Sequence, residues 1–407
     1  MEIRRGSVLA ALATGAMLLG CTEVTPPSGN PLATFAGPSP TTMPTILRSP
    51  DGLPTPTIEA SPNPPSPTQA LIEANWQEVS DPPLDRLHLG SAIAWTGKHF
   101  VVAGIVERVV PERSEGIAFW TSQDGVAWTM GSERSAGSVS DFAFDASGRG
   151  VAIGFLGSEI AAWSSPDGVA WAKAPDQAAF LPQGSETDLN MYGVADSGRG
   201  FIAIGVARMP DPGRAVVLTS PDGVAWTRMP LDPSFSGVRL DDIAGAGGQV
   251  VLVGHTRSPF RNLVWTSDDG RTWSQVPDLP GVDPTDNRSG TYQVAAGPAG
   301  VLVTLRAPDR AWWSTDGATW APAPRLPVID LKIYQMNALA TSAGFVLIGY
   351  SASCTSGLWV SPDATSWACV AGGPPAVGRG DWIVAASSDA IVTSADVGSL
   401  WVAALGN

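Results

Sequence analysis

The sequence predicts an all-β fold, a seven-bladed β-propeller in which each blade has four strands. Three observations carry this prediction. A short motif that ends in Trp recurs along the chain after about residue 70, and its closing Trp residues lie 43 to 55 residues apart. Further short apolar runs, separated by turn residues, precede each copy. Such a period in an all-β pattern is typical of propeller blades. The charged fraction is 15%, with 45 Gly and 36 Pro, which argues against coiled coils and helical bundles.

The repeated motif has the pattern of a β-hairpin tip. One copy reads Leu218-Thr-Ser-Pro-Asp-Gly-Val-Ala-Trp226. Its Pro fixes φ, its Asp bonds its own backbone, and its Gly accepts the left-handed conformation. The apolar residues on both sides predict a third strand before the turn and an outermost strand after it, which carries the closing Trp. The copies begin at Trp120, Trp163, Leu218, Trp265, Trp313 and Trp359, and they close at Trp128, Trp171, Trp226, Trp273, Trp320 and Trp367.

The ends of the chain set the number of blades. Trp401 adds a seventh third-strand position, but too few residues follow it for another outermost strand. Trp76, ahead of the first repeat, adds a seventh closing position. We therefore expect the N-terminal strand to complete the last blade, which closes the ring without an exposed edge. The closing Trp residues are expected to pack between neighbouring blades.

The N-terminus has the features of an export signal. Arg4 and Arg5 precede an apolar run over 8–20, which is too short to span a bilayer. The sequence Leu18-Leu-Gly-Cys21 resembles the bacterial lipobox. That resemblance implies a lipid on Cys21 and a protein exported and anchored to the outer side of the cell membrane. An ordinary secretory signal that contains a Cys is the alternative.

A Pro/Ser/Thr-rich segment follows the signal. Residues 22–70 contain 13 Pro, a composition that cannot bury a core and favours extended conformations. We expect a disordered stalk that holds a domain away from the membrane, although a tolerated low-complexity tail would look the same. The predicted organisation is a lipoprotein signal peptide over 1–20, a linker over 21–72 and the propeller over 73–407.

The repeat also resembles a known family. Thr266-Ser-Asp-Asp-Gly-Arg-Thr-Trp273 matches the Asp-box, or BNR repeat, of sialidase-like propellers, whereas the other copies place the Asp next to the Gly. The resemblance implies a structural role on the outer rim, away from the central site. The aspartates expected in that role are Asp124, Asp167, Asp222, Asp268, Asp316 and Asp363.

Catalytic motifs are not recognisable in the sequence. The resemblance to sialidases implies an early Phe/Tyr-Arg-Ile/Leu-Pro motif, which is missing, and a Tyr nucleophile with a Glu partner, which none of the 4 Tyr displays in sequence. There is also no serine nucleophile elbow, phosphate-binding glycine loop or metal-spaced His/Cys cluster. We expect no catalytic residue, no cofactor and no metal.

Cys354 and Cys369 flank one predicted hairpin of an exported protein and are expected to form a disulfide.

A ligand site, if one exists, is expected where the innermost strands enter the central channel. The polar residues near these entries are Asp141, Asn190, Asp241, Asp242, Gln293, Asn337 and Asp381, with Arg239 and Arg379 adjacent. They could bind a cation, a sugar or a basic segment, and a merely solvated channel mouth is the alternative. The segments Glu107–Gly116 and Val206–Arg214 are further candidate contact surfaces.

The charge balance narrows the possible functions. Lys+Arg 24 against Asp+Glu 38 gives a net charge of −14, which repels phosphate backbones and disfavours nucleic-acid binding. The leading hypothesis is a non-catalytic, monomeric, lipid-anchored propeller that binds a protein or glycan ligand. The alternatives are a sialidase-like glycoside hydrolase and an extracytoplasmic assembly factor like the photosystem assembly propellers that share such repeats.

Overall fold

A computed structural model describes most of the chain beyond residue 74. The described residues all belong to the compact unit Pro62–Asn407. They are 75–79, 87–107, 115–131, 137–175, 177–208, 213–257, 260–277, 279–280, 292–305, 311–323, 337–341, 344–348, 354, 356–370, 384–387, 389–396 and 399–404. Cys21 and the predicted linker lie outside this described part.

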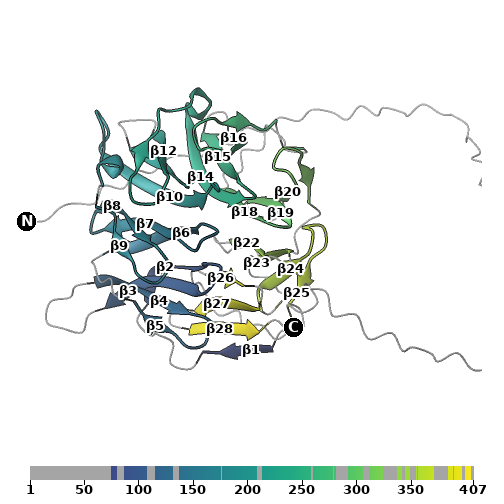
Figure 1. The fold of residues 1–407 in the computed structure, drawn as a ribbon. Helices are drawn as coiled ribbons and strands as arrows, with labels where there is room; N and C mark the ends of the chain where they lie inside the picture. The colour runs from purple at the N-terminus through teal and green to yellow at the C-terminus, as the bar shows by residue number, and fades with distance from the viewer. Residues whose placement is uncertain are drawn as a thin grey trace, which may run out of the picture. The chain divides into compact units, whose positions relative to one another are not determined.

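Seven antiparallel sheets of four strands each form a ring, which confirms the predicted propeller (Figure 1). The closure is also confirmed: β1 (Asn75–Glu78) pairs with β28 (Ser399–Ala404), and Trp76 lies opposite Ala403. In Figure 1 the purple β1 therefore lies beside the yellow β28. Blade 7 thus combines the first described strand of the chain with the last.

Each of the other blades is continuous in sequence, and its strands pair in chain order. Blade 1 consists of β2 (Leu87–Trp95), β3 (Phe100–Glu107), β4 (Glu115–Ser122) and β5 (Thr129–Met130). Blade 2 consists of β6 (Ser138–Phe144), β7 (Gly150–Leu156), β8 (Glu159–Ser165) and β9 (Ala172–Lys173). Blade 3 consists of β10 (Asp188–Asp196), β11 (Phe201–Arg208), β12 (Arg214–Ser220) and β13 (Thr227–Arg228). Short 3₁₀ helices, η1 (Ala178–Phe180) and η2 (Pro233–Phe235), precede blades 3 and 4.

Blades 4 to 7 complete the ring. Blade 4 consists of β14 (Val238–Ala246), β15 (Gln249–Arg257), β16 (Phe260–Ser267) and β17 (Ser274–Gln275), and blade 5 of β18 (Tyr292–Gly297), β19 (Gly300–Leu305), β20 (Ala311–Ser314) and β21 (Ala321–Pro322). Blade 6 consists of β22 (Asn337–Thr341), β23 (Gly344–Ile348), β24 (Leu358–Ser361) and β25 (Ala368–Cys369). Blade 7 consists of β26 (Val384–Ala386), β27 (Ala390–Asp396), β28 and β1. The first strand of each of blades 1 to 7 contacts the first strand of the next blade, so these strands surround the central channel.

The closing Trp residues pack on the preceding blade, as the sequence predicts. Trp226 of blade 3 lies in one core cluster with Ile160 and Phe180, which precede it in the ring. Trp320 of blade 5 packs with Val251 and Val264 of blade 4. Burial of these large apolar rings stabilises the contact between neighbouring blades.

The turns between the third and fourth strands also contact the preceding blade. In blade 3, Asp222 Oδ1 accepts from the N–H groups of Val224 and Ala225, both at 2.9 Å, while Ser220 Oγ accepts from Gly223 N at 2.8 Å. Gly223 has a φ of +77°, and a Cβ at this position would meet Val151 Cγ2 of blade 2 at 2.5 Å. The glycine is therefore required by both its backbone conformation and the close approach of the neighbouring blade.

Two details of the repeat differ from the prediction. In blade 4, Asp269 rather than Asp268 accepts the turn hydrogen bonds, from Arg271 N and Thr272 N at 2.8 Å, because the Asp next to the Gly has the reach to both N–H groups. In blade 5, Trp312 rather than Trp313 occupies the third-strand position, since Trp312 pairs with Val303 just as Trp120 pairs with Val102 in blade 1.

Blade 6 carries its own covalent brace. The predicted disulfide between Cys354 and Cys369 is present, and it connects the start of the hairpin to its last strand. The same hairpin contains Ala364, with a φ of +60°, where the other turns have Gly. The other predicted turn aspartates, Asp124, Asp167, Asp222, Asp316 and Asp363, each accept backbone hydrogen bonds in their turns.

Candidate ligand-binding site

The central channel contains a cavity of about 530 Å³. Residues of all seven innermost strands line it, so it lies on the axis of the ring. Three of the predicted site residues contribute to its wall: Asp141 from β6, Asp242 from β14 and Gln293 from β18. Among the described residues of this lining there is no Arg, Tyr or Glu.

Asp141 and Asp242 hold neighbouring blades together. Asp141 Oδ1 accepts from its neighbour Phe142 N at 2.8 Å, and its Oδ2 accepts from Val194 N of the next blade at 2.8 Å. Asp242 repeats this arrangement two blades further on, with Ile243 N at 2.8 Å and Val294 N of blade 5 at 3.0 Å. Each carboxylate therefore satisfies backbone donors on two blades.

The two carboxylates lie on either side of Gly193. In blades 2, 3 and 4 the innermost strand has a bulge at the same place. The residue just after the bulge is Asp141 in blade 2, Gly193 in blade 3 and Asp242 in blade 4. A Cβ at Gly193 would lie 3.6 Å from Asp141 Oδ2 and 3.6 Å from Asp242 Oδ1. The two oxygens are thus no farther apart than twice that distance, in a cavity that one small ligand could enter.

Burial changes the protonation of this pair. Removal of water by the channel walls raises the pKa of Asp141 to about 7, against the lowering effect of the Val194 and Phe142 N–H groups. Burial likewise raises the pKa of Asp242 to about 7, and the negative charge of Asp141 adds to that shift. Each of the two residues is half-buried and lines the channel cavity.

Arg239 and Asp241 are not in the channel lining. They belong to a second cluster, in which Asp241 Oδ2 lies 2.7 Å from His255 Nδ1 and Asp241 Oδ1 lies 3.8 Å from Arg239 Nε. The Asp241 side chain is fully buried, and the Arg239 guanidinium lies over the ring of Tyr192 at 5.3 Å from its centroid. The adjacent residues Asp241 and Asp242 therefore separate, because the bulge between Leu240 and Asp242 changes the direction of the strand.

The remaining predicted residues are only partly placed. Asn190 lies on β10 opposite Val206, outside the channel lining. Asn337 begins β22, but its side chain lies outside the described part, as do Arg379, Asp381 and the segments 108–114 and 209–212 of the two candidate surfaces.

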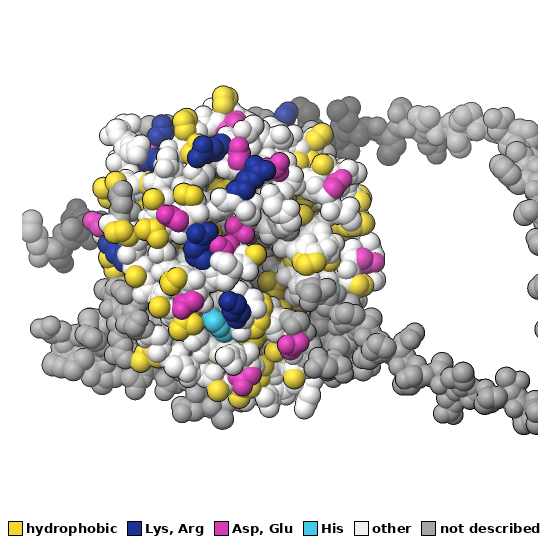
Figure 2. All heavy atoms as spheres, in the orientation of Figure 1, with side chains coloured by type: hydrophobic (Ala, Val, Ile, Leu, Met, Phe, Trp, Pro, Cys, Tyr) yellow, Lys and Arg dark blue, Asp and Glu magenta, His cyan; other side chains and the backbone are white. Residues whose placement is uncertain are grey.

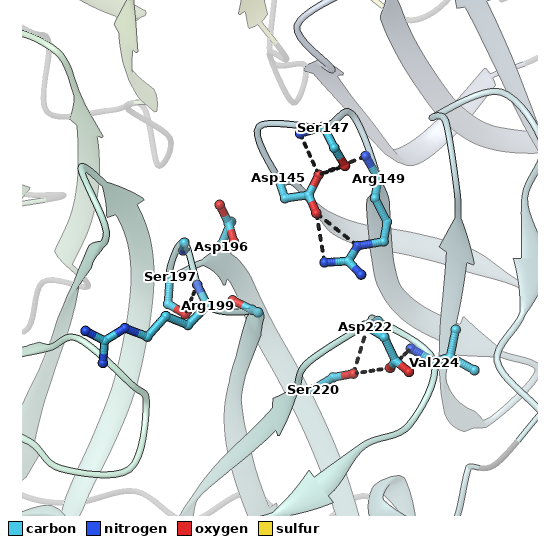
Figure 3. A network of polar contacts seen from close by, with 12 residues as sticks. Asp145, Ser147, Arg149, Asp196, Ser197, Arg199, Ser220, Asp222 and Val224 are labelled. Atoms are coloured by element: carbon cyan, nitrogen blue, oxygen red, sulfur yellow. Dashed lines mark hydrogen bonds and ion pairs between the residues drawn. The ribbon is translucent and has the colours of Figure 1, made fainter.

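The turns after the innermost strands form a face of the ring that the sequence analysis did not single out. Arg149 Nη2 lies 2.8 Å from Asp145 Oδ2, and its guanidinium also packs over the ring of Phe201. Figure 3 shows Arg149 directed toward Asp145, whereas Arg199 extends away from Asp196 and Asp145. A signal was present in the sequence, since the corresponding turns of the first three blades each carry a basic residue: Lys98, Arg149 and Arg199.

Two further hollows lie on this turn face. A groove of about 960 Å³ runs past the turns of blades 3, 4 and 5, and a pocket of about 270 Å³ lies between blades 3 and 4. The residues that the structure describes contain no group of three or more His, Cys, Asp or Glu suited to a metal ion. No helix in the described part is long and apolar enough to cross a membrane.

Comparisons with known proteins support the fold. No protein-family model and no curated protein matches the chain. Among solved structures, a streptogramin B lyase is 10% identical with a TM-score of 0.51, over 83% of this chain and 99% of that chain. YCF48 bound to D1 peptide is 14% identical with a TM-score of 0.47, over 82% and 96%. Trypanosoma rangeli sialidase is 13% identical with a TM-score of 0.45, over 78% of this chain and 55% of its own, so this chain spans about half of that sialidase. At such identities the likeness establishes the propeller fold alone.

Proposed function

We propose that this protein is a non-catalytic binding module that recognises a protein or glycan ligand outside the cytoplasmic membrane. In this proposal a lipid on Cys21 anchors the monomeric chain to the outer side of the membrane. The Pro-rich linker 21–72 then serves as a spacer that carries the propeller. The signal-like N-terminus and the low apolar content of that segment support this arrangement.

One observation carries the binding function. The two acids of the channel, Asp141 and Asp242, each accept two backbone N–H groups and so brace the ring. They tie blade 2 to blade 3 and blade 4 to blade 5, and in this proposal the hollows of the turn face lie on a preorganised frame. A rigid frame lowers the entropic cost of ordering groups upon binding.

The proposal is tested by screening purified full-length protein on glycan and peptide arrays. We expect saturable binding to a restricted group of glycans or peptides, with no turnover of the bound ligand. Absence of binding on both arrays would overturn the proposal.

A second candidate, a glycoside hydrolase, is favoured by the pairing of Asp141 and Asp242 across Gly193. Two carboxyl groups separated by about 5–10 Å, one of them with a raised pKa, are the groups that glycoside hydrolysis uses. The two carboxylate oxygens lie no more than twice 3.6 Å apart across Gly193, and burial raises the pKa of both groups to about 7.

Fluorogenic glycosides, including a sialoside, distinguish the two candidates. Hydrolysis that Asp141→Asn and Asp242→Asn each abolish, while the thermal unfolding of the variants shows that they remain folded, would replace the binding function with the enzymatic one. Equal rates with and without the protein would leave the binding module as the function.

A further inference from the structure

The hollows of the turn face adjoin one another through shared wall residues. The channel cavity and the groove share Gly198, Gly245, Gly247 and Gly248 as walls. The groove and the smaller pocket share Ser197 and Arg199. Neighbouring hollows therefore extend from the axis of the ring across the turns of blades 3 to 5. Figure 2 shows acidic and basic side chains interspersed over one face of the ring.

The small pocket carries positive charge on two exposed arginines. Arg199 from blade 3 and Arg271 from blade 4 both line it, and both side chains are exposed. Unlike Arg149, Arg199 forms no ion pair with any described residue, and Figure 3 shows it directed away from the Asp145–Arg149 pair. Asp269 also lines the pocket, where its Oδ1 accepts from the N–H groups of Thr272 and Arg271. These hydrogen bonds lower its pKa, and the Arg271 charge adds to that effect, so Arg271 has an acidic neighbour in the pocket whereas Arg199 has no ion pair with a described residue.

The groove supplies an unused negative charge. The turn of blade 4 contains two acids, Asp268 and Asp269. Asp269 accepts the hydrogen bonds from Arg271 N and Thr272 N, so Asp268 does not take part in them. It is exposed, and its contact with Gln249 Nε2 is long, at 3.5 Å. Asp316 lines the same groove and is ionised, since the N–H groups of Thr319 and Ala318 lower its pKa to about 2.

Backbone is accessible between these charges. Gly247 and Gly248 form the turn between β14 and β15, and a Cβ at either position would meet nothing within 4 Å. Peptide groups at such a turn are open to hydrogen bonds from a ligand that lies across it. The groove thus offers charges of both signs beside exposed main chain.

We propose that this groove binds an extended peptide segment, with an acidic residue against Arg199 and Arg271 and a basic residue beside Asp268. The inference rests on the binding function proposed above and names its ligand class and its place. Charge complementarity favours a peptide, because a peptide can carry both signs of charge whereas an acidic glycan carries one. The channel acids remain structural in this arrangement.

The experiment measures the affinity of purified full-length protein for peptides selected on a random peptide array, with a glycan array in parallel. The selected peptides are expected to contain both an acidic and a basic residue. The double variant Arg199→Glu with Arg271→Glu should bind them about tenfold more weakly. A peptide in which Lys replaces the acidic residue should bind this double variant better than it binds the unchanged protein.

Matched variants make the outcome decisive. Arg261→Glu changes an exposed Arg on β16, away from the groove, and should leave peptide affinity unchanged. Asp268→Lys should weaken binding and be rescued by an acid in place of the basic residue of the peptide. Selected peptides whose affinity none of the groove variants changes would overturn the groove while the binding function stands. Binding to glycans alone would overturn the peptide, and absence of binding on both arrays would overturn both proposals.

Discussion

Trp171 of blade 2 stacks on Phe119 of blade 1, with ring centroids 4.7 Å apart and planes inclined by 6°. The two residues come from different blades, so this stacking is a contact between blades rather than within one. Trp171 Nε1 also donates to Gly168 O at 2.9 Å, which ties the ring to the turn of its own blade. The repeated Trp thus joins its own hairpin to the preceding sheet.

Truncation of this Trp should therefore destabilise the ring. We expect Trp171→Ala to lower the free energy of unfolding by about 3–5 kcal/mol, because it removes a buried aromatic side chain and leaves a cavity between blades. Chemical denaturation followed by circular dichroism measures the change. Val126→Ala, at an exposed position in the equivalent turn of blade 1, should stay within about 0.5 kcal/mol. Equal effects of the two substitutions would contradict the interblade role.

The fold could be predicted because its signal is repeated. A turn that needs Gly and a closing Trp that needs a neighbouring blade leave marks at a fixed period, and Trp76 and Trp401 then identify the closing blade. Equivalent positions within the motif were harder to assign. Trp312 and Trp313 are adjacent and chemically identical, so only the strand register shows that Trp312 takes the repeated position.

Replacing a turn glycine by alanine has two costs, the strain of a positive φ and the steric clash of the added Cβ, and two glycines allow them to be measured apart. We expect Gly157→Ala to cost about 1 kcal/mol, since its φ is +63° and nothing lies within 4 Å of the added Cβ. Gly223→Ala has a similar φ of +77° but would place its Cβ 2.5 Å from Val151 Cγ2, so it should cost about 1–3 kcal/mol more. Thermal unfolding measures both. Val151→Ala should recover part of the loss in the Gly223 variant, and failure to do so would locate the strain elsewhere.

The candidate site was predicted less completely than the fold. Asp141 and Asp242 could be placed in the channel, because innermost strands recur at known positions in the repeat. The bulge in β14, which carries Asp241 away to His255, has no signature in a single sequence. The pocket of Arg199 has no signature in the sequence, because Arg199 shares it with Arg271 of another blade, 72 positions further along the chain.

Glu186 forms a buried ion pair that should be costly to break. Its carboxylate accepts from both terminal nitrogens of Arg228, at 2.7 and 2.9 Å, and also contacts Arg214. Burial would raise the pKa of Glu186, but the Gln183 N–H and the Arg228 guanidinium outweigh it and lower the pKa. We expect Glu186→Gln to destabilise the protein by about 3–5 kcal/mol, because Arg228 is left buried without its counter-charge.

An exposed pair in the same blade provides the comparison for Glu186. Asp188 and Arg208 lie 3.9 Å apart with both side chains largely in solvent, and Asp188→Asn should change stability by at most about 1 kcal/mol. Denaturation midpoints of the two variants, measured side by side, check the difference. A loss for Asp188→Asn as large as that for Glu186→Gln would show that burial does not set the cost.

The channel aspartates should make the propeller less stable as the pH rises from about 4 to 7. Their pKa values are about 7 in the folded protein against an ordinary value of 3.8, so in this range the folded state keeps protons that the unfolded chain has released. Stability then falls by about 1.4 kcal/mol per pH unit for each group.

The turn aspartates act with the opposite sign, since their lowered pKa values give stability that is lost only as the pH falls below about 4. Unfolding free energies measured between pH 4 and 8 should therefore decline, and Asp141→Asn combined with Asp242→Asn should flatten that decline whatever it does to stability at a single pH. An unchanged slope in the double variant would show that these carboxyl groups are already ionised at pH 5.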